Sequence, residues 1–303
     1  MPRPTALSWI LLSLLALIWG GSFLAVEYAL EGFQPLTIAS LRISMAAVIV
    51  TAVSFAIGHG LPEMSTAMGR RVWLHAVGMA LLSNAVPFSL LSWGQLHVTS
   101  GFAGITMAIV PLIVLPLAHF LVPGEQMSLR KSIGFTVGFA GVVLLIGPGS
   151  ALNSSNAEAE GLARLACLGA AICYSLGSIV TRLTPPVPLL AFSSASLIIA
   201  AITLGPVALI LEGWPDQATR DAWTAVIYLG LLPTAIATIL LVYVIKTAGP
   251  SFMSLVNYQV PVWAVVFGMV FLDEALPIQF IAALVLILAG LAISQARTPR
   301  IRP

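Results

Sequence analysis

Ten separate runs of mostly apolar residues, each about 20 residues long, constrain this chain more than any other feature. A helix of that length crosses the hydrocarbon core of a bilayer. Only 8% of the 303 residues are charged and 59% are hydrophobic, which is more apolar side chain than one soluble core can bury. The chain is therefore predicted to be an all-α integral membrane protein with ten transmembrane helices. The runs cover residues 6–26, 36–57, 72–93, 97–121, 129–147, 161–181, 187–211, 222–246, 250–272 and 277–295.

The longest polar stretch follows the fifth run and divides the chain. It predicts a first repeat at residues 1–148, a linker at 149–160 and a second repeat with a basic tail at 161–303. The first run is long enough to span and lacks a small-x-small cleavage pattern. We therefore interpret it as a transmembrane helix and not as a removed signal peptide.

The positions of Lys and Arg predict the orientation, because these residues concentrate in cytoplasmic loops. With the N-terminus inside and ten crossings, ten of them fall in cytoplasmic segments and only Arg164 and Arg220 fall outside. The remaining one, Arg42, lies within the second run. Both termini are therefore predicted to be cytoplasmic.

The two halves of the chain repeat one another. Each carries a proline, a glutamate and a glycine in the same order, with sixteen residues from the glutamate to the glycine. An aromatic residue stands eighteen residues before each proline, and a phenylalanine nine residues before it. The matched pairs are Trp93 and Tyr243, Phe102 and Phe252, Pro111 and Pro261, Glu125 and Glu274, and Gly141 and Gly290.

Each half contains five runs, and five is an odd number, so the second half enters the membrane upside down. Inverted repeats that meet at an axis in the membrane plane are typical of secondary transporters, which bind their substrate near the midplane. The sequence therefore predicts two inverted five-helix repeats around a central cavity. It favours a transporter over a channel, a receptor or a membrane enzyme.

Several motifs resemble those of the drug/metabolite transporter superfamily. They are Trp19-Gly20-x-Ser22-Phe23, the spacing of Pro35 and Arg42, and the series Pro111, Gly124-Glu125, Gly134 and Gly141 with its echo in the second half. The chain resembles the ten-helix members with paired EamA-type domains over roughly residues 7–148 and 161–295. That resemblance implies a bacterial exporter of amino acids or other metabolites. The segment from Val256 to Pro261 is similar to a motif of aromatic amino-acid exporters.

Polar and aromatic residues in mid-span are expected to face a cavity or another helix, because contact with lipid is costly. Mid-span prolines also free backbone carbonyls. Helices three, four, eight and nine contain such prolines, and with helices one and six they are predicted to line the cavity. The predicted substrate-binding residues are Trp19, Met79, Asn84, Phe88, Tyr174, Ser178, Asn257 and Tyr258.

Two interpretations stay open for most of these residues. Asn84, Asn257 and Tyr258 either contact substrate or form hydrogen bonds between helices. Trp19 and Tyr174 either flank an apolar substrate or pack beside small residues. Arg42 either attracts a carboxylate or has a structural role, by snorkelling to the interface or pairing with an acid near the outer surface.

The glycines 134, 138 and 141 indicate close helix packing or a dimer face. Cys167 and Cys173 are six residues apart in one run, on different faces of a helix, so we predict no disulfide between them. No metal site and no cofactor are predicted.

The energy source is predicted from what the spans lack. No acidic residue lies near the centre of a predicted span, and His75, His97 and His119 lie near helix ends. A proton-coupled carrier commonly keeps a carboxylate there. We therefore expect facilitated export or weakly coupled antiport.

The leading hypothesis is a secondary transporter that exports amino acids or similar small metabolites across the bacterial inner membrane, with neutral or aromatic amino acids as the first candidates. Multidrug efflux is the alternative transporter hypothesis, although the first helix lacks the buried Glu that such pumps use. A channel is also open. A membrane enzyme is disfavoured, because no nucleophile, base or metal ligands cluster in the sequence. The expected partners are the substrate and the bilayer, with no nucleic acid, and the chain is expected to be a monomer or a weak homodimer.

Overall fold

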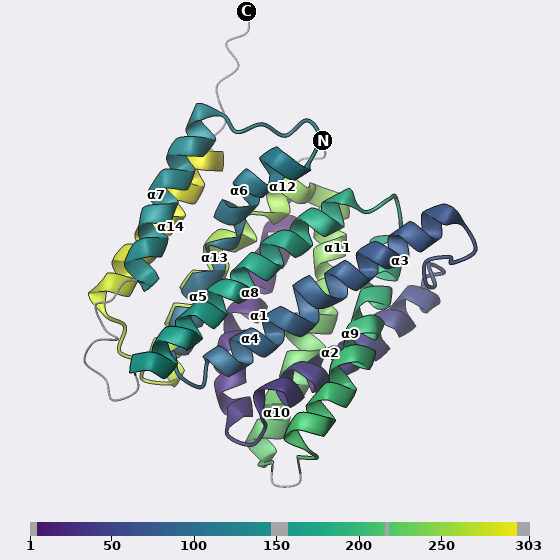
Figure 1. Cartoon of the computed structure of the whole chain (residues 1–303), viewed down its shortest axis with the longest axis horizontal. Coiled ribbons are helices and arrows are strands. Elements are labelled where there is room, and N and C mark those ends of the chain that lie inside the picture. The colour runs from purple at the N-terminus through teal and green to yellow at the C-terminus, as the bar shows by residue number, and fades with distance from the viewer. Residues whose placement is uncertain (1–4, 147–156, 216–217, 296–303) are drawn as a thin grey trace, which may run out of the picture.

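The computed structural model describes residues 5–146, 157–215 and 218–295, and these residues are almost entirely helical (Figure 1). Within these ranges, nine helical segments are long and apolar enough to cross a membrane, and Val256–Phe271 is a shorter apolar helix. The same ranges contain no strand. The prediction of an all-α protein with many membrane spans is confirmed.

In the first half, two of the spans are built from more than one helix. A π-helical segment, η1 (Ala80–Ala85), joins α3 to α4, and a short break separates α5 from α6. The helices are α1 (Ala6–Leu30), α2 (Pro35–Ala56), α3 (Ala67–Met79), α4 (Val86–Gly94), α5 (Ser100–Met107), α6 (Val110–Leu121) and α7 (Leu129–Ile146).

The second half has the same construction. A π-helical segment, η3 (Gly230–Ile236), joins α10 to α11, and a short break separates α12 from α13. The helices are α8 (Ala157–Leu183), α9 (Leu189–Glu212), α10 (Arg220–Leu229), α11 (Ala237–Ala248), α12 (Pro250–Met253), α13 (Val256–Phe271) and α14 (Ile278–Gln295).

The start of α8 differs from the predicted linker. Residues 157–160 are helical, and two acidic side chains, Glu158 and Glu160, lie in the first turn of α8. Carboxylates in a first turn favour the helix, because they interact with the positive end of its dipole. The rest of the predicted linker, residues 149–156, lies outside the described residues.

Threonine side chains begin several of the helices. Thr5, Thr66, Thr99 and Thr219 each accept a hydrogen bond from a backbone N–H of the first helical turn. Such caps satisfy donors that the helix itself leaves unpaired. The polar residues between the apolar runs therefore fix where these spans start.

The two halves run in opposite directions. In Figure 1 the span α3–η1–α4 descends, whereas its counterpart α10–η3–α11 ascends. Helix α1 begins and helix α14 ends at the top of that view, which we name the termini end. We name the opposite end, where α4 ends and α10 begins, the far end.

The two halves also share a backbone conformation that few residues adopt, a positive φ angle just before the repeated glutamate. Gly124, just before Glu125, has φ +84°, and Asp273, just before Glu274, has φ +51°. Among the described residues, Asp273 is the single non-glycine residue with a positive φ. Asp is one of the few side chains that tolerate this region. The Gly-Glu and Asp-Glu pairs therefore build equivalent turns in the two repeats.

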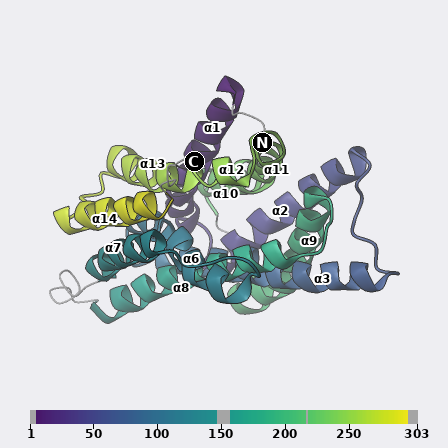
Figure 2. The same ribbon diagram turned by 90° about the horizontal axis from the view of Figure 1, so that it is seen from above.

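Seen from the termini end, α2, α3 and α9 group on one side of the molecule, and α7, α13 and α14 on the other (Figure 2). The largest buried cluster joins α1, α5, α13 and α14, and a second one joins α2 and α9. The spans of the two repeats are thus interleaved, and neither repeat packs as a separate body.

The glycine face of α7 packs against α14 of the same chain. A Cβ built on Gly134 would lie 2.5 Å from the carbonyl oxygen of Gly290, and one on Gly141 would lie 2.9 Å from that of Ala283. Small residues allow two helix backbones to approach this closely. The glycines therefore serve packing within the chain, and the dimer-face interpretation is wrong for this face.

We predict that Gly290→Val destabilises the protein strongly. A Cβ at this position would lie 2.4 Å from both Gly134 O and Gly138 N, and backbone atoms cannot move aside locally. Overpacking of this kind costs about 1–3 kcal/mol or more. Thermal unfolding of the purified protein in detergent measures the effect.

The matched control is Gly161→Ala, because a Cβ on Gly161 meets no atom within 4 Å. Ala favours a helix over Gly by roughly 1 kcal/mol, so this variant is expected to melt at the same temperature as the wild type or slightly above it. Equal melting temperatures for Gly290→Val and the wild type would contradict the α7–α14 contact.

Candidate functional site

The centres of two spans change from α-helix to π-helix. These are η1, in the middle of the span Ala67–Gly94, and η3, in the middle of the span Arg220–Ala248. Asn84 in η1 and Thr234 in η3 are 150 residues apart, the same separation as Pro111 and Pro261. The inverted repeat therefore contains the same helix defect twice. Short π-helical segments inside α-helices are frequent at functional sites.

One polar side chain in each π segment binds a carbonyl five residues earlier. Asn84 Nδ2 donates to Met79 O at 3.2 Å, and Thr234 Oγ1 donates to Leu229 O at 2.7 Å. A backbone carbonyl in hydrocarbon needs a partner, because no water is there to provide one. The two side chains therefore bind the backbone of their own spans at the helix defects.

Each of these side chains also binds the span that packs across it. Asn84 Nδ2 donates to Ser196 Oγ of α9 at 3.1 Å. Thr234 Oγ1 accepts from Nε and Nη2 of Arg42 in α2, each at 3.2 Å. Asn84, Ser196, Thr234 and Arg42 are all buried. The polar residues at the centre of the bundle thus form two equivalent contacts.

Arg42 is held in the interior and does not reach the surface, and it pairs with no acid in the part of the chain that the structure describes. Only 6% of its surface is exposed, and its guanidinium carbon lies 3.8 Å from the centre of the Phe88 ring. Tyr174 and Tyr228 are close enough to interact with it electrostatically. Among the described residues Arg42 therefore shows neither the interfacial position nor the acid partner foreseen from the sequence, although its contact with Thr234 does join two spans.

The cost of this placement is considerable. An arginine at the centre of a membrane span costs roughly 2.5–3.5 kcal/mol on insertion scales. The contact with Phe88 offsets part of this cost, since a desolvated cation–π contact contributes about 2 kcal/mol. Thr234 Oγ1 is a neutral acceptor and brings no counter-charge to the guanidinium.

Two aromatic residues predicted from the sequence join this centre. Trp19 Nε1 of α1 donates to Pro233 O in η3 at 3.0 Å. Tyr174 of α8 meets Phe88 edge to face, with ring centres 6.4 Å apart. We define the central cluster as Trp19, Arg42, Asn84, Phe88, Tyr174, Ser196 and Thr234.

Other predicted residues lie outside the central cluster. Met79 contributes its carbonyl to Asn84, while its side chain packs on an apolar group that includes Val72. Ser178 is exposed and donates to Tyr174 O within α8. Asn257 donates to Ser254 O within the chain just before it, and Tyr258 packs on the largest core.

Sequence reasoning missed Ser196 and Thr234, and it left Arg42 out of the predicted substrate-binding residues. The signal for Thr234 was present, because the 150-residue register that relates the two halves maps Asn84 onto it. Ser196 and Arg42 are likewise equivalent, as each is the eighth residue of its helix, α9 and α2 respectively. Arg42 belongs to the Pro35–Arg42 motif but Ser196 belongs to none, so only the repeat could have identified the two as a pair.

A polar cavity of about 580 Å³ opens at the far end. It contains Glu27, Glu160 and Glu274, and each of these carboxylates has a partner. Glu27 accepts from Gln95 Nε2 at 2.8 Å, and Glu160 pairs with Arg164. The Glu274 oxygens accept from the backbone N–H groups of Ser100 and Gly101 at 2.7 and 3.0 Å. None of the residues that line this cavity belongs to the central cluster. They are Glu27, Gln95, Leu96, His97, Val98, Thr99, Glu160, Leu272 and Glu274.

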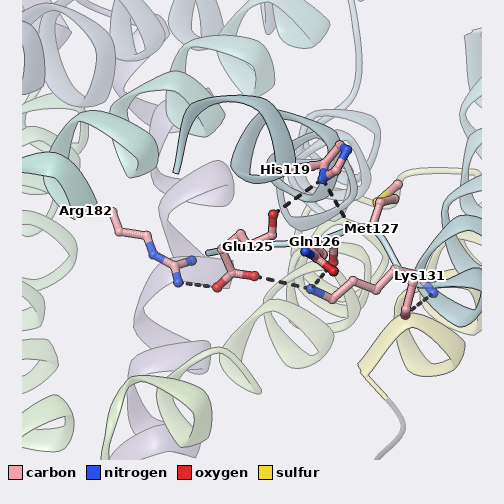
Figure 3. Close-up of polar contacts among 7 residues, drawn as sticks. His119, Glu125, Gln126, Met127, Lys131 and Arg182 are labelled. Atoms are coloured by element: carbon pink, nitrogen blue, oxygen red, sulfur yellow. Dashed lines mark hydrogen bonds and ion pairs between the residues drawn. The ribbon is translucent and has the colours of Figure 1, made fainter. Parts of the chain in front are cut away.

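Glu125, the repeat counterpart of Glu274, binds cations at the termini end (Figure 3). It pairs with Arg182 at the end of α8 and, at 3.3 Å, with Lys131 at the start of α7. The hydrogen bond from Arg182 is the main reason that the pKa of Glu125 lies below its usual value of 4.5. Lys131 lowers that pKa further, whereas partial burial opposes both.

Comparison with known proteins identifies one family profile and several relatives that match most of the chain. A family profile described as the EamA-like transporter family matches residues 7–147 and 161–295. An uncharacterized transporter of Archaeoglobus fulgidus is 24% identical, with 94% of this chain and 97% of the relative covered. The uncharacterized inner membrane transporter YedA of Escherichia coli is 26% identical, with 84% and 79% covered. Protein PecM of Dickeya dadantii is 23% identical, with 94% and 93% covered.

One solved crystal structure has the same fold. It superposes with a TM-score of 0.68 and covers 95% of this chain and 96% of its own, at 20% identity. At that identity the likeness concerns the fold alone.

We predict that Glu125→Gln lowers the stability of the protein near pH 7 by about 0.2–1 kcal/mol, the usual range for partly exposed ion pairs. Because the folded-state pKa of Glu125 lies below 4.5, the pairing contributes fully above that pH and is lost as the pH falls through the folded-state value. The melting temperatures of variant and wild type should therefore converge on acidification.

Glu63→Gln is the control, because Glu63 is exposed and forms no ion pair within the described ranges. Its melting temperature should follow that of the wild type at every pH. A gap between Glu125→Gln and the wild type that persisted well below pH 4 would count against the ion pairs as its cause.

Proposed function

The chain belongs to the EamA-like transporter family, so it is a multi-span membrane transporter, and we propose that it exports amino acids or similar small metabolites as a secondary transporter. The proposed mechanism is alternating access, in which a central site opens first to one side of the membrane and then to the other. The proposed transport involves no chemical reaction and no cofactor. The transporter acts as a monomer or a weak homodimer.

The observation that carries the proposal is the pair of π-helical segments in two spans of opposite direction. Each segment lies at the middle of its span and is bound by a side chain from a neighbouring helix. A π segment interrupts the regular hydrogen-bond ladder, so the span can bend there at less cost than elsewhere. Two such sites related by inversion give the bundle two equivalent ways to bend.

The contacts at the two ends support the same mechanism. At the far end, Glu274 binds the N-terminus of α5 through Ser100 and Gly101. Its counterpart Glu125 binds Arg182 and Lys131 at the termini end. A repeated sequence that makes different contacts at its two ends is expected of a transporter resting in one of two alternating states.

The proposed location is the bacterial inner membrane, with both termini in the cytoplasm. Ten of the thirteen Lys and Arg residues then fall in cytoplasmic segments. The relative YedA is named as an inner membrane transporter of Escherichia coli. In this orientation the termini end faces the cytoplasm, and the polar cavity opens to the outside.

We predict saturable uptake of at least one neutral or aromatic amino acid into liposomes that contain the purified protein. The panel also contains nucleosides and the lipophilic cation tetraphenylphosphonium, which represents multidrug efflux. Protein-free liposomes correct for leakage. Uptake of the cation alone would favour the multidrug alternative, and no uptake of any amino acid would refute the proposed cargo.

We further predict that an imposed pH gradient changes this flux little, because the central cluster contains no carboxylate among the described residues. The same liposomes, with and without the gradient, provide the measurement. Accumulation of substrate well above its external concentration only when the gradient is present would refute gradient-independent export.

A further inference from the structure

The repeat makes one interhelical contact twice, but with different residues. The eighth residue of α9, Ser196, binds Asn84 in η1, and the eighth residue of α2, Arg42, binds Thr234 in η3. The inverted repeat relates α9 to α2 and η1 to η3. The two contacts are therefore one structural element, present once with a neutral side chain and once with a cation.

The neutral version shows what the contact itself requires. A serine hydroxyl is enough to join α9 to η1, with an oxygen-to-nitrogen distance of 3.1 Å. Holding two spans together therefore needs no positive charge, and a shorter side chain performs the task in the other repeat. The guanidinium of Arg42 must be explained by something else.

Among the described residues, the charge of Arg42 also lacks a counter-ion. The ion pairs of the described residues involve Glu125 and Glu160, with Lys131, Arg164 and Arg182 as the cations. Arg42 uses Nε and Nη2 on Thr234 and its flat face on Phe88. Its Nη1 group donates to no atom in the described part of the chain. A guanidinium edge matches the geometry of a carboxylate.

We propose that Arg42 binds the carboxylate of the transported molecule, which makes the substrate class small carboxylate-bearing metabolites. This assignment rests on the proposed transport function and names the cargo of the same central site. Phe88 lies against the guanidinium and Tyr174 lies beside Phe88, and both rings would face the apolar part of the substrate. The carboxylate supplies the counter-charge that the protein itself does not.

The charges of the central cluster indicate which group of an amino acid is needed for binding. The central cluster contains a cation and no carboxylate, so it offers no ionic partner to an ammonium group. The carboxylate is therefore required for binding and the amino group is not. A deaminated acid should bind about as well as the amino acid, and an amino-acid amide, which keeps the ammonium and loses the carboxylate, should not.

The test compares matched ligands on the purified protein in detergent. The ligands are phenylalanine, 3-phenylpropanoate and phenylalaninamide, and the corresponding leucine, 4-methylpentanoate and leucinamide. Binding is measured as the concentration-dependent rise in melting temperature. In at least one series, the two acids should bind about tenfold or more tightly than the amide, the difference typical of a charge-assisted hydrogen bond.

The variants decide whether Arg42 is responsible. Arg42→Gln should reduce the affinity for the acids to that for the amide, whereas Arg42→Lys should keep part of the preference because it keeps the charge. Arg164→Gln is the matched control, since it removes another buried arginine, one that pairs with Glu160. That variant is expected to lower the melting temperature of the ligand-free protein and to leave the preference for acids intact.

Three results would overturn the proposal. They are an acid preference that survives in Arg42→Gln, the failure of every acid to bind, and stabilisation by sodium chloride equal to that by the acids at the same ionic strength. A merely structural Arg42 would lower stability without changing the ratio of the two affinities.

Liposome flux separates this proposal from the transport function. Carboxylate-dependent binding without flux would leave the site standing and remove the function. Equal flux of acid and amide, unchanged in Arg42→Gln, would leave the function standing and remove the site.

Discussion

In a membrane, a backbone polar group that finds no partner within the protein finds none at all, and the rest of this structure depends on that constraint. At the helix ends, Thr66, Thr99 and Thr219 meet it by binding the first free N–H groups. At the centre it is harder to meet, because the π segments η1 and η3 interrupt two hydrogen-bond ladders. There Asn84 and Thr234 also bind carbonyls of their own spans. Both side chains belong to the central cluster, so residues that stabilise the two interrupted spans also form the candidate site.

Duplication of the chain reproduces the backbone more faithfully than the side chains. The turn before Glu125 and the turn before Glu274 both contain a residue with positive φ, although one is Gly124 and the other is Asp273. Beyond that turn the equivalence ends, since Glu274 binds the N-terminus of α5 while Glu125 binds two cations. The equivalent start of α12 begins with Pro250, which has no N–H to offer. The two ends of the bundle are therefore closed by different means, although the same motif is found at both.

The sequence predicted the helical membrane fold because that fold follows from run length and composition, which need no tertiary information. It predicted part of the site for a similar reason: Trp19, Asn84, Phe88 and Tyr174 are polar or aromatic residues in mid-span, and such positions are costly unless used. It failed where the outcome depends on which helix lies opposite. Nothing along α2 indicates that Arg42 reaches Thr234, 192 residues later, instead of the nearby surface. Nor does Gly134 itself indicate that α14, and not a second molecule, packs against it.

Differences between the residues at equivalent positions of the two repeats are informative, because the backbone around them is the same. Where the two halves keep the same residue type, as at Pro111 and Pro261, the comparison of the halves does not separate fold from function. Where they differ at equivalent positions and make the same contact, the contact explains only what the two residues share. Ser196 and Arg42 share a polar group that reaches across to a π segment, and they differ by a buried positive charge. A charge in the interior of a membrane protein is costly to keep. Since the same contact forms in the other repeat without a charge, we propose that the charge serves the cargo, which would then be an anion or carry one.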